Sequence, residues 1–393
     1  MSSINELITK LCPDGVEFWQ LGSAIKLNFG TRITKLEDSG TIYPVYGGGG
    51  ESFRTDQFNR EGEYVVSRFA MSEKCVRLVK GKFWMLDSGF TFDPVDDSID
   101  KNFVAYLLLN MQPAIYACSS QGAQKNLKTD QFRKFRIPIP PLEIQQEIVR
   151  ILDTFTELEA ELEAELEARK RQYAYYRDSL LNFPEAGGVR RIPMGELGTI
   201  FGGLTGKSKA DFSDGNARFV SYVNIFNNIA VCMDTDDFVH VGPDERQRSL
   251  RRGDVLFTGS SETWEEVGMS SVLTGEVDEP LYLNSFSIGY RFNESDVFDP
   301  EFTKHLFRSE GMRKQLVNTA SGVTRFNVSK ARLAKVEVPI PVLEEQHRIA
   351  SVLDNFDALV NDLSIGLPAE LNARRKQYEH YRDRLLTFEE ALV

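Results

Sequence analysis

The chain has 393 residues, 41% of them hydrophobic, and is long enough to bury at least two cores. Its four scattered cysteines form no CxxC pair and have no histidine partners at zinc spacing, which predicts neither a metal site nor a disulfide framework. No signal peptide and no run near the roughly 18 apolar residues of a membrane span are found, so we expect a cytoplasmic protein without membrane contact.

The formal net charge of −12 argues against a uniformly basic surface for nucleic acid, but the charge is unevenly distributed. Residues 1–136 hold 17 basic and 16 acidic side chains, and residues 137–186 hold 5 and 11. Residues 187–337 hold 18 and 21, and residues 338–393 hold 6 and 10. Local basic surfaces are therefore compatible with the net charge, and a basic partner could add affinity.

Residues 1–136 form the first predicted domain. They are rich in Gly, aromatic and β-branched residues, and short alternating runs such as EYVVSRF and KCVRLV predict strands. We expect a mixed α/β domain.

Residues 137–186 are predicted to form a long helix that recurs at the end of the chain, within residues 338–393. The segment Arg136–Phe183 reappears as Glu337–Phe388, and the second copy is four residues longer. Each copy begins with a Pro-rich stretch that forces an extended backbone and continues with apolar residues three and four apart. About 40 helical residues would span roughly 60 Å, the length of a spacer. The apolar stripes include Phe155, Leu158, Leu162, Leu166 and Tyr173 in the first copy and Phe356, Leu359, Leu363 and Tyr378 in the second.

Residues 187–337, between the two helices, form the second predicted domain. They resemble the first domain only at their edges, where Gly30 aligns with Gly203 and Asn126 with Asn327. Runs such as DVLFTG and YLNSFSIGYRF predict strands. In the second helix, Gly366-Leu367-Pro368 is expected to form a kink, because proline cannot donate the helical hydrogen bond.

Together these features resemble the specificity subunits of type I restriction-modification enzymes. The motifs that carry the resemblance are the opening LCPDGVEFWQLG, the [IV]PIPxLExQ start of each helix, the LDxF that follows and the RxxQYxxYRDxLLxF ending. The resemblance covers the whole chain. It implies an α+β fold in which two mixed α/β target-recognition domains are separated by two long helices. These helices would form an antiparallel coiled coil with an internal pseudo-twofold repeat.

The resemblance also implies a non-catalytic DNA-recognition subunit. Each domain would read one half of a split target in double-stranded DNA, and the helices would set the gap and dock two methyltransferase subunits. Restriction or motor subunits would join them. S-adenosylmethionine, ATP and magnesium are expected on these partners, with no cofactor bound by this chain. The alternative is a coiled-coil structural adaptor without sequence-specific readout.

The run ELEAELEAELEA at residues 157–168 consists of three tandem four-residue units. Each unit would add about 6 Å of helix, comparable to one or two base-pair steps of about 3.4 Å. We hypothesise that the number of units sets the unread gap. The plainer alternative is a solvated acidic helix face with Leu158, Leu162 and Leu166 buried.

Two glycine-rich stretches are candidates for contact with DNA. GGLTGKS resembles a P-loop, but Phe201 stands where that motif requires glycine, so nucleotide binding is not expected. The stretch could instead form a glycine turn followed by a basic segment that contacts phosphate. The plainer interpretation is an exposed turn without a ligand. In YGGGGES, backbone at Gly48 could approach a groove closely, or the run could be a structural turn. The candidate phosphate contacts in the basic segments are Arg32, Lys35, Lys207 and Lys209.

Further candidates lie in polar and basic stretches of both domains. Lys125-Asn126 and Arg325-Phe326-Asn327 occupy the same place at the end of each domain, which suggests backbone contact, because base readout should differ between the halves. Structural capping is the alternative. Polar groups suited to base edges come from the second domain. The remaining candidates are Arg54, Arg68, Lys74, Tyr222, Asn224, Ser260 and Ser261.

No catalytic constellation is found in the sequence. It contains no [DNS]PP[YF] adenine-methyltransferase motif and no HExxH, and its four histidines stand in unconnected contexts. Runs of carboxylates such as DPVDD are usually solvated surface. We therefore predict no active site in this chain.

Overall fold

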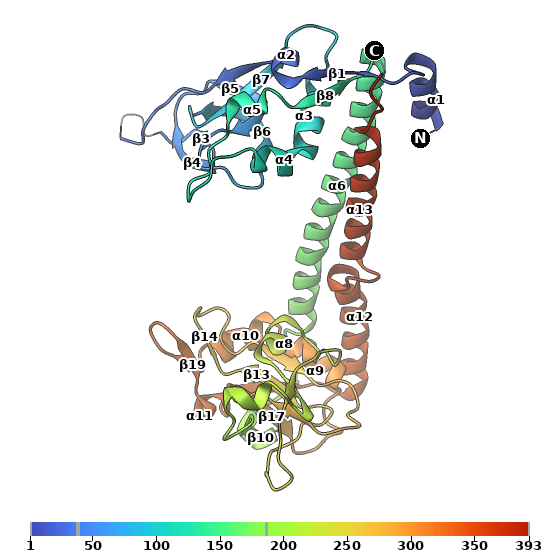
Figure 1. Cartoon of the computed structure of the whole chain (residues 1–393). Helices are drawn as coiled ribbons and strands as arrows, with labels where there is room; N and C mark the ends of the chain where they lie inside the picture. Colours follow the sequence, from blue (N-terminus) through green and yellow to red (C-terminus); the bar gives the residue numbers. More distant parts are fainter. Residues whose placement is uncertain (1, 37–39, 185–187, 392–393) are drawn as a thin grey trace. The chain divides into compact units, whose positions relative to one another are not determined.

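The computed structural model describes residues 2–36, 40–184 and 188–391, and the chain divides into two compact units. Unit 1 comprises the residues up to Glu163 together with those from Glu370 onward, and unit 2 comprises Ala164–Ala369. Two helices, α6 (Leu142–Leu180) and α13 (Leu367–Leu385), contribute to both units (Figure 1). The domain boundaries at 136, 186 and 337 stay a prediction, because each unit combines a globular part with parts of the long helices.

Unit 1 is built on a six-stranded sheet with the order β2-β7-β5-β6-β3-β4. Neighbouring strands are antiparallel except β3 and β6, which are parallel. The runs EYVVSRF and KCVRLV lie largely in β5 and β6, so their prediction as strands is confirmed. A separate antiparallel pair joins β1 to β8. The strands are β1 (Glu17–Gln20), β2 (Ile25–Phe29), β3 (Tyr43–Gly47), β4 (Gly50–Thr55), β5 (Arg60–Ser67), β6 (Val76–Met85), β7 (Gly89–Pro94) and β8 (Arg136–Ile139).

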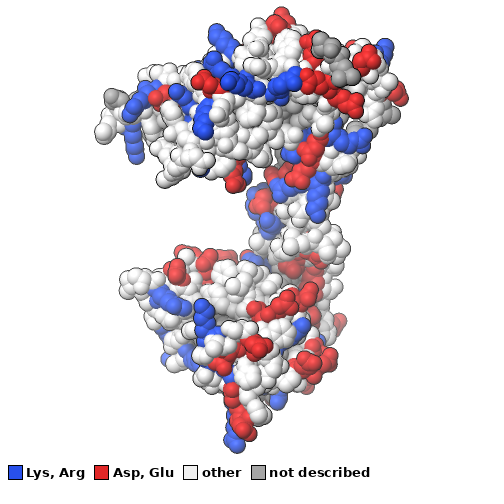
Figure 2. Space-filling view, viewed as in Figure 1, with Lys and Arg blue, Asp and Glu red and all other residues white. Residues whose placement is uncertain are grey.

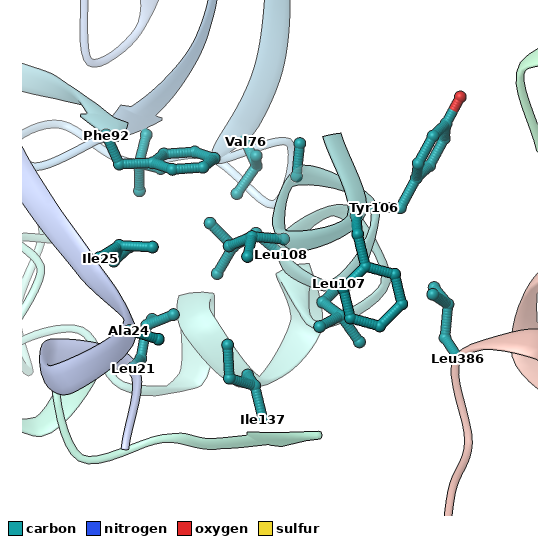
Figure 3. Close-up of a cluster of buried hydrophobic side chains, with 14 of the residues drawn as sticks. Leu21, Ala24, Ile25, Val76, Phe92, Tyr106, Leu107, Leu108, Ile137 and Leu386 are labelled. Carbon is teal, nitrogen blue, oxygen red and sulfur yellow. The ribbon is translucent and has the colours of Figure 1, made fainter. Parts of the chain in front are cut away.

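The core of unit 1 lies between this sheet, its helices and the end of the chain. The carboxylate of Asp100 caps α3 by accepting from the Phe103 amide, and six of the ten α3 residues are buried. Figure 3 shows Phe92 of β7, Leu108 of α3 and Leu386 of the C-terminal segment within one buried cluster. The helices are α1 (Ser2–Leu11), α2 (Leu21–Ala24), α3 (Lys101–Asn110), α4 (Gln112–Ala117) and α5 (Thr129–Phe132).

Unit 2 repeats this plan with smaller sheets. Its strand orders are β10-β17-β13-β15, β12-β11-β16 and β14-β19-β18, and β20 pairs with β9 as β8 pairs with β1. The strands are β9 (Arg190–Pro193), β10 (Gly198–Gly202), β11 (Ala217–Val220), β12 (Phe238–Val239), β13 (Val255–Thr258), β14 (Ser260–Ser261), β15 (Ser270–Val272), β16 (Leu281–Leu283), β17 (Ser287–Phe292), β18 (Ala320–Ser321), β19 (Phe326–Val328) and β20 (Glu337–Ile340).

Short helices connect the strands of unit 2, and one longer helix follows β20. The 3-10 helix η2 (Lys209–Phe212) begins with a capping box between Ser208 and Asp211. The α-helices are α7 (Met194–Leu197), α8 (Tyr222–Asn227), α9 (Pro300–Leu306), α10 (Glu310–Val317), α11 (Lys330–Leu333) and α12 (Leu343–Asn361).

Aromatic contacts pair the helices within each unit. In unit 1, Phe155 of α6 contacts Tyr378 and Tyr381 of α13, while Arg375 bonds to Glu159 at 2.7 Å and also to Glu163. Rising numbers on α6 thus meet falling numbers on α13, so the helices run antiparallel. In unit 2, Tyr176 of α6 stacks on Phe356 of α12, with ring centroids 5.3 Å apart.

The second long helix is interrupted rather than kinked. Helix α12 ends at Asn361, and α13 begins only at Leu367. The carboxylate of Asp362 accepts from the Ser364 and Ile365 amides at 2.7 and 3.2 Å, which turns the chain out of the helix. Leu363 therefore lies in this turn, 73% exposed, and its prediction as part of the helical stripe is wrong.

The remaining stripe residues differ in burial. Leu166 and Tyr173 are buried, each with 8% of its surface exposed, whereas Leu158 and Leu359 are about two-fifths exposed. The first copy is a single helix, but it starts at Leu142, because the Pro-rich stretch before it forms strand β8. The prediction of an extended backbone at that stretch is confirmed.

A buried glutamine fixes the start of each long helix. In unit 1, the Gln145 amide nitrogen donates to the carbonyls of Ser98 and Pro140, at 3.0 and 2.7 Å, and its oxygen accepts from the Asp100 amide at 2.8 Å. In unit 2, Gln346 makes the same three bonds, to Val297, Pro341 and Asp299, at 2.9 Å each. Both glutamines are fully buried. The glutamine of the LExQ motif therefore ties the helix to the cap of α3 or α9.

Candidate nucleic-acid interface

In unit 1, the segment that follows β5 pairs with the segment that precedes α5. The Leu127 amide donates to the Arg68 carbonyl at 2.8 Å, and the Met71 amide donates to the Lys125 carbonyl at 3.0 Å. Between them, Ala70 has a left-handed backbone with φ of 49°, and its amide donates to the Asn126 side chain at 3.4 Å. The structure thus brings Arg68 beside Lys125 and Asn126, which lie far from it in sequence.

In unit 2, the segment that follows β13 pairs with the segment that precedes α11 in the same way. The Val328 amide donates to the Gly259 carbonyl at 2.9 Å, and Ser260 pairs with Asn327 across the β14-β19 ladder. Arg325 donates from Nε and Nη2 to the Ser260 hydroxyl, at 3.1 and 2.9 Å. The Tyr222 hydroxyl donates to the Ser260 carbonyl at 2.9 Å. Tyr222, Ser260, Arg325 and Asn327 therefore form one group, and Ser261 follows directly in β14.

A third segment completes the arrangement in each unit. The Ser88 carbonyl accepts from the Arg68 and Phe69 amides in unit 1, and the Phe286 carbonyl accepts from the Gly259 amide in unit 2. We call these three paired segments the loop frame. It comprises residues 68–71, 86–88 and 125–127 in unit 1, and residues 259–261, 284–286 and 325–328 in unit 2.

Gly30 in unit 1 and Gly203 in unit 2, which precede the predicted basic residues, explain why the two domains align at these positions. A Cβ atom at Gly30 would lie 2.2 Å from the Leu86 carbonyl oxygen, and one at Gly203 would lie 1.9 Å from that of Asn284. In both units this glycine therefore allows the chain to pass directly beside the loop frame. The internal repeat extends from the helices into the globular parts.

The loop frame carries different side chains in the two units. In unit 1, the Arg68 guanidinium lies 4.5 Å from the Phe69 ring and 5.1 Å from the Phe29 ring. In unit 2, Phe286 takes the place of Ser88 and is 74% exposed. A shared backbone with unlike side chains is the arrangement expected of two surfaces that read different sequences.

An open pocket of about 480 Å³ lies at the loop frame of unit 2. Tyr222 and Phe226 on one of its walls stack with centroids 6.2 Å apart and planes 13° from parallel. Aromatic, hydroxyl, carboxylate and guanidinium groups meet there, a mixture suited to base edges. The pocket is lined by Tyr222, Phe226, Ser260, Ser261, Glu262, Glu266, Phe286 and Arg325.

Other predicted residues bond to partners within their own unit. Lys207, whose side chain is 2% exposed, pairs with Glu245 at 2.5 Å, and its hydrogen bond lowers the pKa of that carboxyl to about 2. Asn224 is buried, and its amide group bonds to the backbone of Cys232. The Gly48 amide donates to the Ser88 hydroxyl of the loop frame at 3.1 Å, and its carbonyl accepts from Ser67 and Arg77, at 2.7 Å each. These bonds stabilise loops, and DNA contact by these residues stays a prediction.

The remaining basic candidates lie outside the loop frame. Arg54 pairs with Glu51 and donates to the Ile42 carbonyl. The other four are exposed, and in the described part of the chain their side chains make no hydrogen bond or ion pair with the loop frame. These are Arg32, Lys35, Lys74 and Lys209.

Several residues at this site were missed by the sequence analysis. Glu262 directly follows the predicted residues Ser260 and Ser261, and Phe286 lies in YLNSFSIGYRF, which predicts one continuous strand. The structure instead has a turn at 284–286, between β16 and β17. Asn284-Ser285 is a pair typical of turns, but the apolar residues on both sides of it predict an uninterrupted strand.

Two half-buried arginines hold the walls of the unit 2 pocket. Arg308 donates to the carbonyls of Ile225, Phe226 and Asn228, at 2.9, 3.0 and 3.2 Å, at the end of α8. Arg313 donates to those of Glu265 and Val267, at 2.9 and 2.8 Å. Desolvation lowers the pKa of each guanidinium to about 10. Both side chains bond to backbone carbonyls around the pocket, and their positions in sequence do not reveal this.

The charge of the molecule fits local rather than uniform recognition. On the face shown in Figure 2, basic and acidic side chains are interspersed over each unit.

The described residues contain no group of three or more His, Cys, Asp or Glu side chains that could hold a metal ion. Among residues 2–36, 40–184 and 188–391, no helix has the length and apolar character needed to cross a bilayer.

Each unit contains the same loop frame with a different set of side chains, and α6 and α13 contribute to both units. This arrangement defines a recognition protein with two distinct binding surfaces. The family described as "Type I restriction modification DNA specificity domain" matches residues 13–168 and 189–373, and the chain belongs to this family. It is thus a DNA-specificity subunit, a non-catalytic component of a type I restriction-modification system.

Individual relatives agree with this assignment. A putative type I restriction enzyme specificity subunit of Haemophilus influenzae is 28% identical over 367 residues, which cover 90% of each chain. The EcoR124I/EcoR124II specificity subunit of Escherichia coli is 32% identical over 295 residues, covering 72% of this chain and 70% of that one. The fold is similar to the crystal structure of an S subunit from M. genitalium, with a TM-score of 0.56 and 17% identity over 95% of this chain and 96% of that one.

Proposed function

We propose that the chain recognises a bipartite target in double-stranded DNA, one half-site through each unit, and presents it to two methyltransferase subunits. Restriction or motor subunits join the complex when cleavage occurs. S-adenosylmethionine, ATP and magnesium belong to those partners, and the chain acts in the cytoplasm, where its DNA lies. One observation carries the proposal: both units have the same loop frame, and its side chains differ between them.

Methylome sequencing tests this proposal directly. Cells that carry the cognate methyltransferase are compared with and without the chain. We expect methyladenine at a split motif only when the chain is present. If no chain-dependent motif appears although the methyltransferase is expressed and active, the chain is a structural adaptor and the proposal fails.

The spacer hypothesis gives a separate prediction. Residues 157–168 lie within the continuous helix α6, so deletion of one unit such as Glu161–Ala164 shortens that helix by about 6 Å. We expect the unread gap to shorten by one or two base pairs while both half-sites keep their sequence. Glu161→Gln, which preserves the length, should leave the gap unchanged. A deletion that alters a half-site would contradict the hypothesis.

A further inference from the structure

The guanidinium of Arg325 is positioned with one side left available. Its Nε and Nη2 both bond to the Ser260 hydroxyl, so that side of the planar group is occupied. The opposite edge, formed by Nη1 and the second Nη2 hydrogen, has no hydrogen bond or ion pair with any described residue. Because the hydroxyl restrains the side chain, less rotamer entropy is lost when that edge binds a ligand.

A carboxylate lies in the same pocket without neutralising this arginine. Glu262 lines the pocket with Arg325, yet the described residues show no ion pair between them and no hydrogen bond to the Glu262 side chain. Glu266 accepts from the Thr263 hydroxyl at 2.5 Å. A phosphate group would be repelled by these two carboxylates, so the pocket favours a ligand that offers both acceptors and a donor.

An exposed aromatic ring borders the pocket on a well-fixed turn. The Phe286 amide donates to the Asn284 side chain at 3.0 Å, and the buried Asn284 amide group donates to the Val220 carbonyl at 2.9 Å. The turn is therefore held from both sides while the ring remains 74% exposed. A large apolar side chain on a fixed turn fits van der Waals contact with the edge of a base pair in the groove.

Base-pair chemistry identifies the ligand. Two adjacent acceptors that match a planar arginine edge occur at guanine N7 and O6 in the major groove, and the paired cytosine offers an N4 amino donor that a glutamate can accept. An adenine-thymine pair does not offer two adjacent acceptors on one base.

We propose that the unit 2 pocket reads a G·C base pair. Arg325 donates to guanine, Glu262 accepts from cytosine, and Phe286 packs beside the pair. This inference rests on the proposed function, because it names one base pair of the half-site that unit 2 reads. In unit 1, where Ser88 takes the place of Phe286, we expect a different contact.

Variants of the full chain, expressed with the cognate methyltransferase and examined by methylome sequencing, test the inference. Arg325→Gln and Glu262→Gln are expected to relax the same G·C position of one half-site, with discrimination lowered about 10- to 100-fold. The other half-site and the gap should stay unchanged. Arg325→Lys keeps the charge but loses the bidentate edge, and it should relax the same position.

Two control variants make the same substitutions, glutamate to glutamine and arginine to glutamine, at residues outside the pocket. Glu265→Gln lies in the same loop, and Arg251→Gln is an exposed arginine of unit 2. Both should preserve the motif. The inference is overturned if the pocket variants keep the wild-type motif, relax different positions, or weaken methylation at all sites equally, as loss of a phosphate contact would. A wild-type chain without any split motif would instead count against the proposed function.

Discussion

Gln145→Leu is expected to lower the free energy of unfolding of unit 1 by about 3 kcal/mol or more. The change leaves the carbonyls of Ser98 and Pro140 and the Asp100 amide without their buried partner, and each such group costs about 1–3 kcal/mol. Chemical denaturation of the purified chain measures the effect. Gln346→Leu removes the equivalent three bonds in unit 2 and should cost a similar amount.

The neighbouring residue supplies the control for this prediction. Gln146 lies on the same turn of α6 but is exposed, so Gln146→Leu should change stability by no more than about 0.5 kcal/mol. Equal effects of the two variants would show that the buried hydrogen bonds do not fix the start of the helix.

Gly48→Ala is expected to destabilise unit 1 by about 3 kcal/mol or more and to abolish recognition of its half-site. A Cβ atom at this position would lie 1.7 Å from the Phe69 carbonyl oxygen and 3.1 Å from that of Ser88. Both oxygens belong to the loop frame, and backbone atoms cannot move aside as a flexible side chain can. Thermal unfolding and the methylation motif together measure the two effects.

The adjacent glycine again allows a matched comparison. A Cβ atom at Gly49 would have no heavy atom within 4 Å, so Gly49→Ala should be close to neutral in stability. If Gly48→Ala folds normally and the half-site is retained, the close contact does not position the loop frame. If Gly48→Ala folds normally but the half-site changes, then the glycine serves DNA approach rather than packing.

The order of domains and long helices could be predicted from the sequence because it depends on repetition and periodicity. The two copies of the helix, their Pro-rich starts and the family motifs are local patterns that one chain displays in full. The glutamine of the LExQ motif was visible as a repeated residue, but its role was not. Its three partners come from two other segments, and only the folded chain shows that the space around it is closed.

The candidate site could be predicted only in part from the sequence. Lys125-Asn126 and Arg325-Asn327 could be singled out because they occupy equivalent places in the two halves, and the structure shows each pair beside a second predicted segment. Lys207 carries the same charge as the other basic candidates, yet the structure pairs it with Glu245, which is 38 residues away. Composition cannot distinguish a free lysine from a paired one.

The sequence by itself determined the repeat, the two helices, the two α/β domains and the family. Tertiary structure alone decided that the second helix breaks at Asp362, that each domain contains the same loop frame, and that Arg325, Glu262 and Phe286 share a pocket. The physical reason is the range of the interactions involved. Helix periodicity acts over four residues, whereas the hydrogen bonds between the segments of the loop frame join residues 19 to 69 positions apart. The approach of these segments depends on packing around glycines such as Gly48 and Gly203.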